Sequence, residues 1–178
     1  MHSPHLSPPD PRCASGSLKW ELPDEAATLA LGRALAPSLE AGMVVWLSGD
    51  LGAGKTTLVR GLLTALGCAG PVKSPTYTLV EVYVVSSLYL YHFDFYRFTY
   101  PEEFIDAGLG EYFRDDAVCL VEWPEKAAGF VPPADLALCL RFPDGAPRSG
   151  RIVELLARSG RGRRCLNGLA SRIFRGAA

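Results

Sequence analysis

Apolar and polar positions along this 178-residue chain switch between the periods of strands and helices. The runs at 43–47 and 117–121 are wholly apolar, which is typical of strands covered on both faces of a sheet. Residues 25–36 and 55–66 carry apolar side chains at helical spacing, and Asp24 precedes the first of these segments as a candidate N-cap. Further strands are predicted at 77–85, 88–95, 136–142 and 152–157, and short helices at 101–107 and 164–174.

The order of these elements predicts an α/β fold with a central mixed β-sheet flanked by helices. The turn Ser86-Ser87 should join its two neighbouring strands into an antiparallel hairpin, so the sheet cannot be wholly parallel. Residues 1–19 are rich in proline and serine and are expected to be a disordered extension, or sequence upstream of the true start of the protein. Residues 20–160 are expected to form a single domain, and residues 161–178 a basic C-terminal tail that can form a short helix.

Charge is distributed unevenly along the chain. Residues 141–178 hold nine arginines against two acids, a balance of +7, whereas the preceding 140 residues carry −8. Such a tail can contact nucleic acid or an acidic protein, or simply keep the chain soluble, and the sequence leaves these interpretations open. Five cysteines lack metal-ligand spacing, no apolar run reaches membrane-spanning length, and no secretory signal is recognisable. We therefore expect a cytoplasmic protein with no membrane contact.

The strongest chemical signal is the stretch 49–57, Gly-Asp-Leu-Gly-Ala-Gly-Lys-Thr-Thr. It follows a predicted strand and begins a predicted helix, as a phosphate loop requires. Lys55 supplies a charge for the terminal phosphates, and the hydroxyl of Thr56 is placed to bind Mg²⁺. The predicted nucleotide-binding residues of the loop are Gly52, Ala53, Gly54, Lys55, Thr56 and Thr57. The motif thus predicts nucleoside triphosphate binding in a three-layer phosphate-loop NTPase-like fold.

Two carboxylates are candidates for work beside the phosphates. Glu122 follows the apolar run 117–121 and is the first choice for holding the metal, directly or through water. Asp94 ends a less regular strand and is the candidate for positioning the attacking water or supporting the metal. Which of the two contacts the metal directly stays open. His92 shares the strand face of Asp94, and a structural role is favoured for it over direct catalysis.

A segment rich in hydroxyl groups follows the phosphate-loop helix. Ser74, Thr76 and Thr78 are predicted to form a nucleotide-sensing switch, because segments in this position are often ordered by the γ-phosphate and its metal. Trp123 comes directly after Glu122 and is expected to pack over or beside the site.

Four motifs in this order resemble the bacterial TsaE (YjeE) family, the small ATPases of tRNA threonylcarbamoyladenosine synthesis. They are residues 49–57, 74–81 (Ser-Pro-Thr-Tyr-Thr-Leu-Val-Glu), 91–97 (Tyr-His-Phe-Asp-Phe-Tyr-Arg) and 120–124 (Leu-Val-Glu-Trp-Pro). The resemblance runs from about residue 22 to about residue 157. It implies a protein that binds ATP and Mg²⁺, hydrolyses ATP slowly and has no transferase chemistry of its own. The implied partner is the TsaB–TsaD pair, which threonylcarbamoylates adenosine 37 of tRNAs that read ANN codons. Contact with tRNA is then indirect, through that complex, and no DNA is involved.

The resemblance also implies roles for particular residues. It assigns Thr56 and Glu122 to Mg²⁺, makes Asp94 the other essential acid, and includes Trp123 in the active region. The family's N-terminal helix lies near the nucleotide, which makes Glu25 a candidate contact. Departures from the family pattern are Val82 in place of a proline, a longer turn at 144–149 and an unusual tail after residue 160.

Two other kinds of function are alternatives to this one. A small-molecule kinase shares the phosphate loop, but no lid-like helical insertion is evident in the sequence and the arginines gather in the tail. A GTPase is disfavoured because no Asn-Lys-x-Asp motif occurs. A non-enzymatic nucleotide-sensing or RNA-binding module would use the basic tail, although that tail lacks the interleaved aromatic residues of a base-stacking surface.

Overall fold

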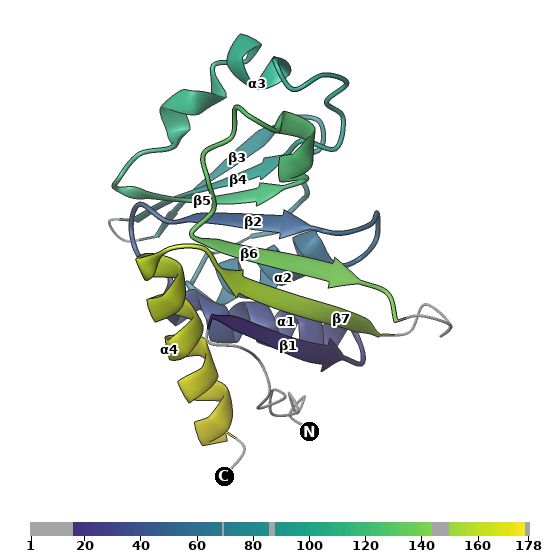
Figure 1. The fold of residues 1–178 in the computed structure, drawn as a ribbon, viewed down its shortest axis with the longest axis vertical. Coiled ribbons are helices and arrows are strands. Elements are labelled where there is room, and N and C mark those ends of the chain that lie inside the picture. Colours follow the sequence, from purple (N-terminus) through teal and green to yellow (C-terminus); the bar gives the residue numbers. More distant parts are fainter. Residues whose placement is uncertain (1–15, 69, 86–87, 144–149, 177–178) are drawn as a thin grey trace.

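A seven-stranded mixed sheet organises the protein (Figure 1). The computed structural model describes residues 16–68, 70–85, 88–143 and 150–176, and the side chains up to residue 173. The strand order is β1-β7-β6-β2-β5-β4-β3. The strands are β1 (Ser17–Leu22), β2 (Val44–Ser48), β3 (Val80–Val85), β4 (Leu88–Asp94), β5 (Ala117–Glu122), β6 (Leu136–Arg141) and β7 (Arg151–Ala157).

The four central strands run parallel. β2 pairs in parallel with both β5 and β6, and β5 pairs in parallel with β4. The outer pairs, β1 with β7, β7 with β6 and β4 with β3, are antiparallel. The predicted mixed sheet and its hairpin are therefore confirmed, while the turn Ser86-Ser87 itself lies outside the described residues. Because β2, β4, β5 and β6 point the same way, their carboxyl ends meet at one edge.

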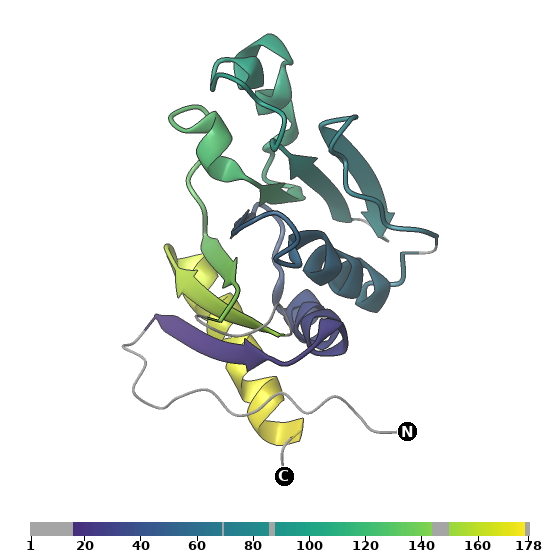
Figure 2. The same cartoon turned by 90° about the vertical axis from the view of Figure 1, so that its right-hand side faces the viewer.

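Helices cover the sheet and join its strands. Helices α1 and α2 lie together on one side of the sheet (Figure 2), and α4 packs against β6, β7 and α1. Their bounds are α1 (Glu25–Leu35), α2 (Lys55–Ala65), α3 (Glu103–Asp106) and α4 (Gly160–Gly176), with short 3₁₀ helices η1 (Ala36–Ser38), η2 (Leu109–Tyr112) and η3 (Pro124–Ala127). The side chain of Asp24 caps α1 as predicted, accepting the Ala27 N–H at 2.8 Å.

Alternating side chains of the central strands enter two separate cores. In β2, Val45 and Leu47 join the core that includes α1, α2 and α4, whereas Val44 and Trp46 belong to or pack against the opposite core. That second core is rich in aromatic residues, among them Phe93, Phe95, Phe98 and Phe104. β5 is buried along its whole length, as its apolar run predicts. The central strands, whose ends carry the site, are thus packed on both faces by core residues.

Three predicted boundaries were wrong for identifiable reasons. Ser17 to Lys19 fall in the predicted disordered extension, but they belong to β1. This strand forms because it pairs with β7, more than a hundred residues away in the sequence. Residues 1–15 lie outside the described part of the chain. The strand predicted at 77–85 begins only at Val80, because a turn precedes it in which Leu79 has φ 64° and donates its N–H to Pro75 at 2.7 Å. The helix predicted at 101–107 is helical only from Glu103 to Asp106.

The basic tail is a packed helix, longer than the segment 164–174 that was predicted. Leu166 and Leu169 are buried in the core. Several of its arginines bind the segment between α1 and β2: Arg161 donates to the Gly42 carbonyl at 3.0 Å, Arg164 pairs with Glu40 at 2.7 Å, and Arg172 donates to the Pro37 carbonyl at 3.2 Å. Arginines that the sequence left available for nucleic acid are thus used within the fold.

Candidate nucleotide-binding site

The loop at 49–54 joins the central strand β2 to helix α2 at the carboxyl edge of the parallel strands. Gly49 has φ 132°, and a Cβ there would collide with the Leu140 carbonyl of β6. Gly54 has φ 104° and precedes the first residue of α2 without any side-chain cap. Glycine is favoured at both positions because it adopts these angles readily, and at Gly49 it also allows the close approach of Leu140. The loop is therefore shaped to expose backbone N–H groups at the start of a helix.

Lys55 is enclosed at the centre of the site. Its side chain is largely buried, at 4% relative exposure, and Nζ donates to the carbonyls of Gly49 at 2.6 Å and Asp50 at 3.0 Å. The ammonium also lies 3.8 Å from the centroid of the Trp123 ring, a cation–π contact. Burial lowers the pKa of Lys55, and the carboxylate of Glu122 partly offsets that shift. The cation is thus held inside the loop, where a terminal phosphate would meet it.

Glu122 is the last residue of β5 and accepts two hydrogen bonds at one oxygen. The Thr56 hydroxyl donates to its Oε1 at 2.8 Å, and His92 Nε2 lies 2.9 Å from the same atom. Because an ionised carboxylate only accepts, this contact is a hydrogen bond in the tautomer that carries its proton on Nε2. The acid and the hydroxyl predicted to bind Mg²⁺ are therefore in direct contact. Hydroxyl and carboxylate oxygens are donors that Mg²⁺ prefers, so this pair suits the metal.

Asp94 ends the adjacent strand β4 and is the register partner of Glu122. Its Oδ2 accepts the hydroxyls of Ser74 at 2.5 Å and Thr76 at 2.8 Å, and its Oδ1 accepts the Tyr96 N–H at 3.0 Å. The two predicted acids thus lie side by side but have different partners: Glu122 is bound to the phosphate-loop helix, whereas Asp94 is bound to the predicted switch segment.

Trp123 has a left-handed backbone, with φ 58°. Such a conformation is unusual for a bulky residue and costs of order 1–3 kcal/mol, so the surroundings must enforce it. Its N–H donates to the Leu47 carbonyl of β2 at 3.2 Å, and its ring lies 5.2 Å from that of Tyr96. The turn directs the indole over Lys55, as expected for a residue beside the site.

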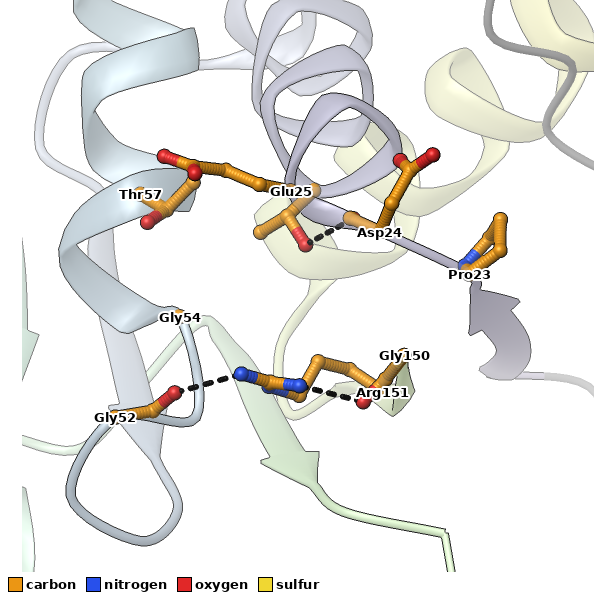
Figure 3. A pocket seen from close by; sticks show the side chains of 9 residues that line it. Pro23, Asp24, Glu25, Gly52, Gly54, Thr57, Gly150 and Arg151 are labelled. Carbon is orange, nitrogen blue, oxygen red and sulfur yellow. Dashed lines mark hydrogen bonds between the residues drawn. The ribbon is translucent and has the colours of Figure 1, made fainter. Parts of the chain in front are cut away.

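Two pockets flank the phosphate loop. The first, of about 330 Å³, brings together most of the predicted site: Lys55, Thr56, Ser74, Thr76, Asp94, Glu122 and Trp123. The second, of about 430 Å³, lies on the other side of the loop (Figure 3) and is lined by Asp24, Glu25, Gly52, Gly54, Thr57 and Arg151. One pocket thus holds the strand-end acids Asp94 and Glu122, and the other lies at the start of α1.

Some residues lie elsewhere or were not foreseen. Thr78 is exposed and its hydroxyl donates to Glu81 Oε1 at 3.1 Å, so the structure does not bring it to the pocket with Ser74 and Thr76. His92 was assigned a structural role, yet its ring contacts Glu122 directly. No spacing rule could have shown Arg151 beside the loop, since it comes almost a hundred residues later.

The fold and site define an α/β protein of the phosphate-loop NTPase-like class: a central parallel strand, a glycine-rich loop and helix, and acids on the neighbouring strand ends. The family whose sequence model matches is described as "Threonylcarbamoyl adenosine biosynthesis protein TsaE", over residues 22–149. The chain belongs to the TsaE family.

Curated relatives and a solved structure agree with this assignment. The tRNA threonylcarbamoyladenosine biosynthesis protein TsaE of Haemophilus influenzae is 42% identical over 160 residues, covering 87% of this chain and 99% of the relative. The protein of the same name from Bacillus subtilis is 40% identical, covering 70% of this chain and 77% of the relative. The crystal structure of YdiB from Bacillus subtilis superimposes with a TM-score of 0.72 at 30% identity, covering 93% of this chain and 99% of that one.

Among the described residues, no group of three or more His, Cys, Asp and Glu side chains could hold a metal ion. None of the helices in the described part of the chain combines the length and apolar character needed to cross a bilayer.

Proposed function

We propose that this protein is a Mg²⁺-dependent ATPase that works with the TsaB–TsaD pair in the threonylcarbamoylation of adenosine 37 of ANN-decoding tRNAs. The observation that carries the proposal is the pairing of Thr56 with Glu122 beside Lys55, in a chain of the TsaE family. The names of the relatives place their function in the same tRNA modification. Such a protein would act in the cytoplasm, would not contact a membrane, and would reach tRNA through its partners.

Each group in the site has a task in ATP hydrolysis. The loop N–H groups bind the phosphates, and Lys55 places its charge against the terminal ones. Nζ, which donates to the carbonyls of Gly49 and Asp50, would exchange these contacts for phosphate oxygens. Thr56 and Glu122 would hold Mg²⁺, and bound Mg²⁺ supplies charge that offsets the developing negative charge on the phosphoryl oxygens. Thr56 and Glu122 line one pocket with Asp94, which keeps these tasks within one small volume.

Asp94 has the second acidic role. Its carboxylate is the candidate for accepting a hydrogen bond from the attacking water, because it lines the same pocket as Thr56 and Glu122. Its Oδ2 accepts the hydroxyls of Ser74 and Thr76, and its Oδ1 accepts the Tyr96 N–H. A water bound at Oδ2 would therefore displace one of those hydroxyls. This exchange would report the nucleotide state to a partner through the 73–78 segment.

The nucleoside half of ATP would extend toward the second pocket. Glu25 and Thr57 line that pocket and their side chains point toward one another in Figure 3. Glu25 is exposed and lies 3.6 Å from Arg60, so it is available at the surface of the pocket and not enclosed in it. Glu25 is the candidate contact from α1 to the nucleotide.

A single set of assays separates this proposal from its alternatives. The protein should release ADP and inorganic phosphate in equal amounts with Mg²⁺, and should be retained by immobilised TsaB–TsaD to an extent that depends on ATP. A small-molecule kinase would instead transfer the phosphoryl group to an acceptor and release no phosphate. A nucleic-acid-binding module would retain bare tRNA without nucleotide, with an affinity that falls steeply as salt rises. Partner binding that ignores nucleotide, together with no phosphate release, would contradict the proposal.

A further inference from the structure

Arg151 links strand β7, near one edge of the sheet, to the phosphate loop. It is the first residue of β7, and β6 separates β7 from the strand that carries the loop. Its Nε donates to the Ala53 carbonyl at 3.0 Å, and its Nη2 donates to the Gly52 carbonyl at 3.0 Å. Figure 3 shows the guanidinium reaching across the second pocket to Gly52. One planar side chain thus binds two consecutive carbonyls of the loop.

The base of this side chain is itself held in place. Arg151 pairs with Leu22 of β1 in the antiparallel register, and Nη1 donates back to the Gly150 carbonyl at 2.6 Å. The guanidinium carbon lies 4.2 Å from the centroid of the Phe142 ring. Because the fork is planar and fixed at several points, it can hold the loop carbonyls in one direction at a low cost in side-chain entropy.

The direction of those carbonyls determines where the loop N–H groups point. A peptide unit is planar, so a carbonyl held toward Arg151 directs the N–H of the same unit to the opposite side. The Ala53 carbonyl shares its peptide unit with the N–H of Gly54, the residue before α2. A cation donating to this carbonyl also polarises the unit and makes its N–H a stronger donor. No side chain caps α2, and Arg151 is a contact from outside the loop that orients the peptide unit between Ala53 and Gly54.

We infer that Arg151 is a positioning residue for phosphate binding: it holds the loop in its anion-binding shape before nucleotide arrives. The inference rests on the proposed ATP site and adds to it a residue outside the four family motifs. Preorganised donors lower the free energy that binding must spend on ordering the loop. The ligand class addressed is the polyphosphate of a nucleotide, so ADP and ATP should be affected alike. Loss of Arg151 should weaken nucleotide affinity and leave turnover at saturation nearly unchanged. The reason is that Arg151 does not line the pocket that holds Asp94 and Glu122.

The test compares Arg151→Ala and Arg151→Lys with Arg163→Ala, which removes the same charge from an exposed position on α4. In Arg151→Ala, the Kd for ATP and for ADP should rise about tenfold, the change that 1.4 kcal/mol of binding free energy produces. The value of kcat at saturating ATP should stay within about twofold, and amides at 50–55 should exchange faster in the nucleotide-free protein. Arg151→Lys should recover only part of the affinity, because an ammonium lacks the planar fork. Arg163→Ala should behave like the parent.

Two outcomes would overturn the inference. The first is a parent-like Kd in Arg151→Ala. The second is full recovery by Arg151→Lys, which would assign the effect to charge alone. If Arg151→Ala does not fold, Arg151→Gln, which keeps most of the stem, provides the same comparison. A parallel titration of Lys55→Ala separates failure of this inference from failure of the proposed function: loss of ATP binding in Lys55→Ala with parent-like Arg151→Ala overturns only the role of Arg151. Parent-like binding in Lys55→Ala would overturn the ATP site itself.

Discussion

His92 Nε2 lies 2.9 Å from Glu122 Oε1, and both side chains are buried, at 0% and 3% relative exposure. The histidine is in β4 and the glutamate at the end of β5, so two adjacent parallel strands supply the pair. Its other ring nitrogen, Nδ1, is buried without a hydrogen-bond partner among the described residues. Leaving Nδ1 buried and unpaired has an energetic cost. Among the described residues, the polar contact of this ring is therefore the one that Nε2 makes with Glu122.

From this contact we expect His92 to orient the carboxylate of Glu122. His92→Phe keeps a ring but loses the donor, so kcat should fall roughly tenfold to a hundredfold, as for other residues that orient metal ligands. ATP affinity should change little. His92→Gln carries an amide N–H and should recover part of kcat, which a role in packing alone would not explain. Steady-state kinetics of the two variants, with thermal unfolding as a check on folding, measure this. Equal kcat in His92→Phe and the parent would contradict an orienting role.

Lys55→Ala should abolish or greatly weaken ATP binding, because it removes the buried cation aimed at the phosphates. Lys55→Arg should not rescue it, since the space between the loop carbonyls and the Trp123 ring fits a compact ammonium. Titration with ATP measures both variants. Lys19→Ala, which removes an exposed lysine of β1, is the matched control. A parent-like titration of Lys55→Ala would show that the phosphate-loop assignment is wrong.

Glu122→Gln and Asp94→Asn should have different effects, because the two acids have different partners. Glu122→Gln should lower Mg²⁺-dependent turnover roughly 10²-fold or more, through loss of a metal-linked contribution of several kcal/mol. Asp94→Asn should also reduce turnover but keep ATP affinity closer to that of the parent. Turnover and ATP affinity measured over a range of Mg²⁺ concentrations distinguish them. Glu125→Gln changes an exposed acid three residues away and should have little effect. Equal loss of ATP binding in both site variants would refute the division of roles.

Thr76→Ala should weaken ATP-dependent association with TsaB–TsaD more than it weakens ATP binding. The Thr76 hydroxyl contacts Asp94 at 2.8 Å, so it can respond to a change at that acid. The structure supplies a control two residues later: Thr78→Ala removes an exposed hydroxyl that bonds only Glu81 among the contacts described. Pull-downs with and without ATP measure the association. Hydrogen exchange across residues 73–80 should slow with a non-hydrolysable ATP analogue. Unchanged exchange, with partner binding that ignores nucleotide, would remove the switch role.

Two buried thiols predict how stability depends on alkaline pH. Burial raises the pKa of Cys119 and of Cys165 to about 12, from an ordinary value of 9.0. Between these values the folded protein keeps the two protons and the unfolded chain loses them. The free energy of unfolding should therefore fall as pH rises from 9 to 12, by at most about 1.4 kcal/mol per pH unit for each thiol. Denaturant unfolding of the parent and of Cys119→Ala/Cys165→Ala should show a shallower fall in the double variant. An identical slope would contradict the raised pKa values.

The same burial predicts which thiols react. Exposed Cys139 should be alkylated by iodoacetamide at pH 8 well before Cys119 and Cys165, as mass spectrometry of the modified peptides would show. Prompt alkylation of Cys119 and Cys165 in the folded protein would indicate that the two hydrophobic cores that hold these thiols open readily.

The local features of this protein can be predicted from its amino-acid sequence. Wholly apolar runs identified the buried strands, Asp24 identified the start of α1, and the order of glycines, Lys55 and Thr56 identified the loop between β2 and α2. These features can be read because each depends on neighbouring residues: strand burial on an apolar run, a cap on one side chain, a phosphate loop on glycine at fixed offsets. Glu122 and Asp94 were identifiable for the same reason, as acids at the ends of strands.

Contacts between distant residues depend on the three-dimensional fold. β1 exists because β7 pairs with it, and Arg151 reaches Gly52 because β6 and β7 place it beside the loop. Thr76 faces Asp94 while Thr78 does not, because a turn with Leu79 in a left-handed conformation delays the start of β3. The tail arginines bind the segment before β2 since α4 packs its apolar side on the core. These contacts join residues that lie from 18 to more than 130 positions apart in the sequence. Strand order and register determine which of these residues meet, and local sequence patterns do not encode either of them.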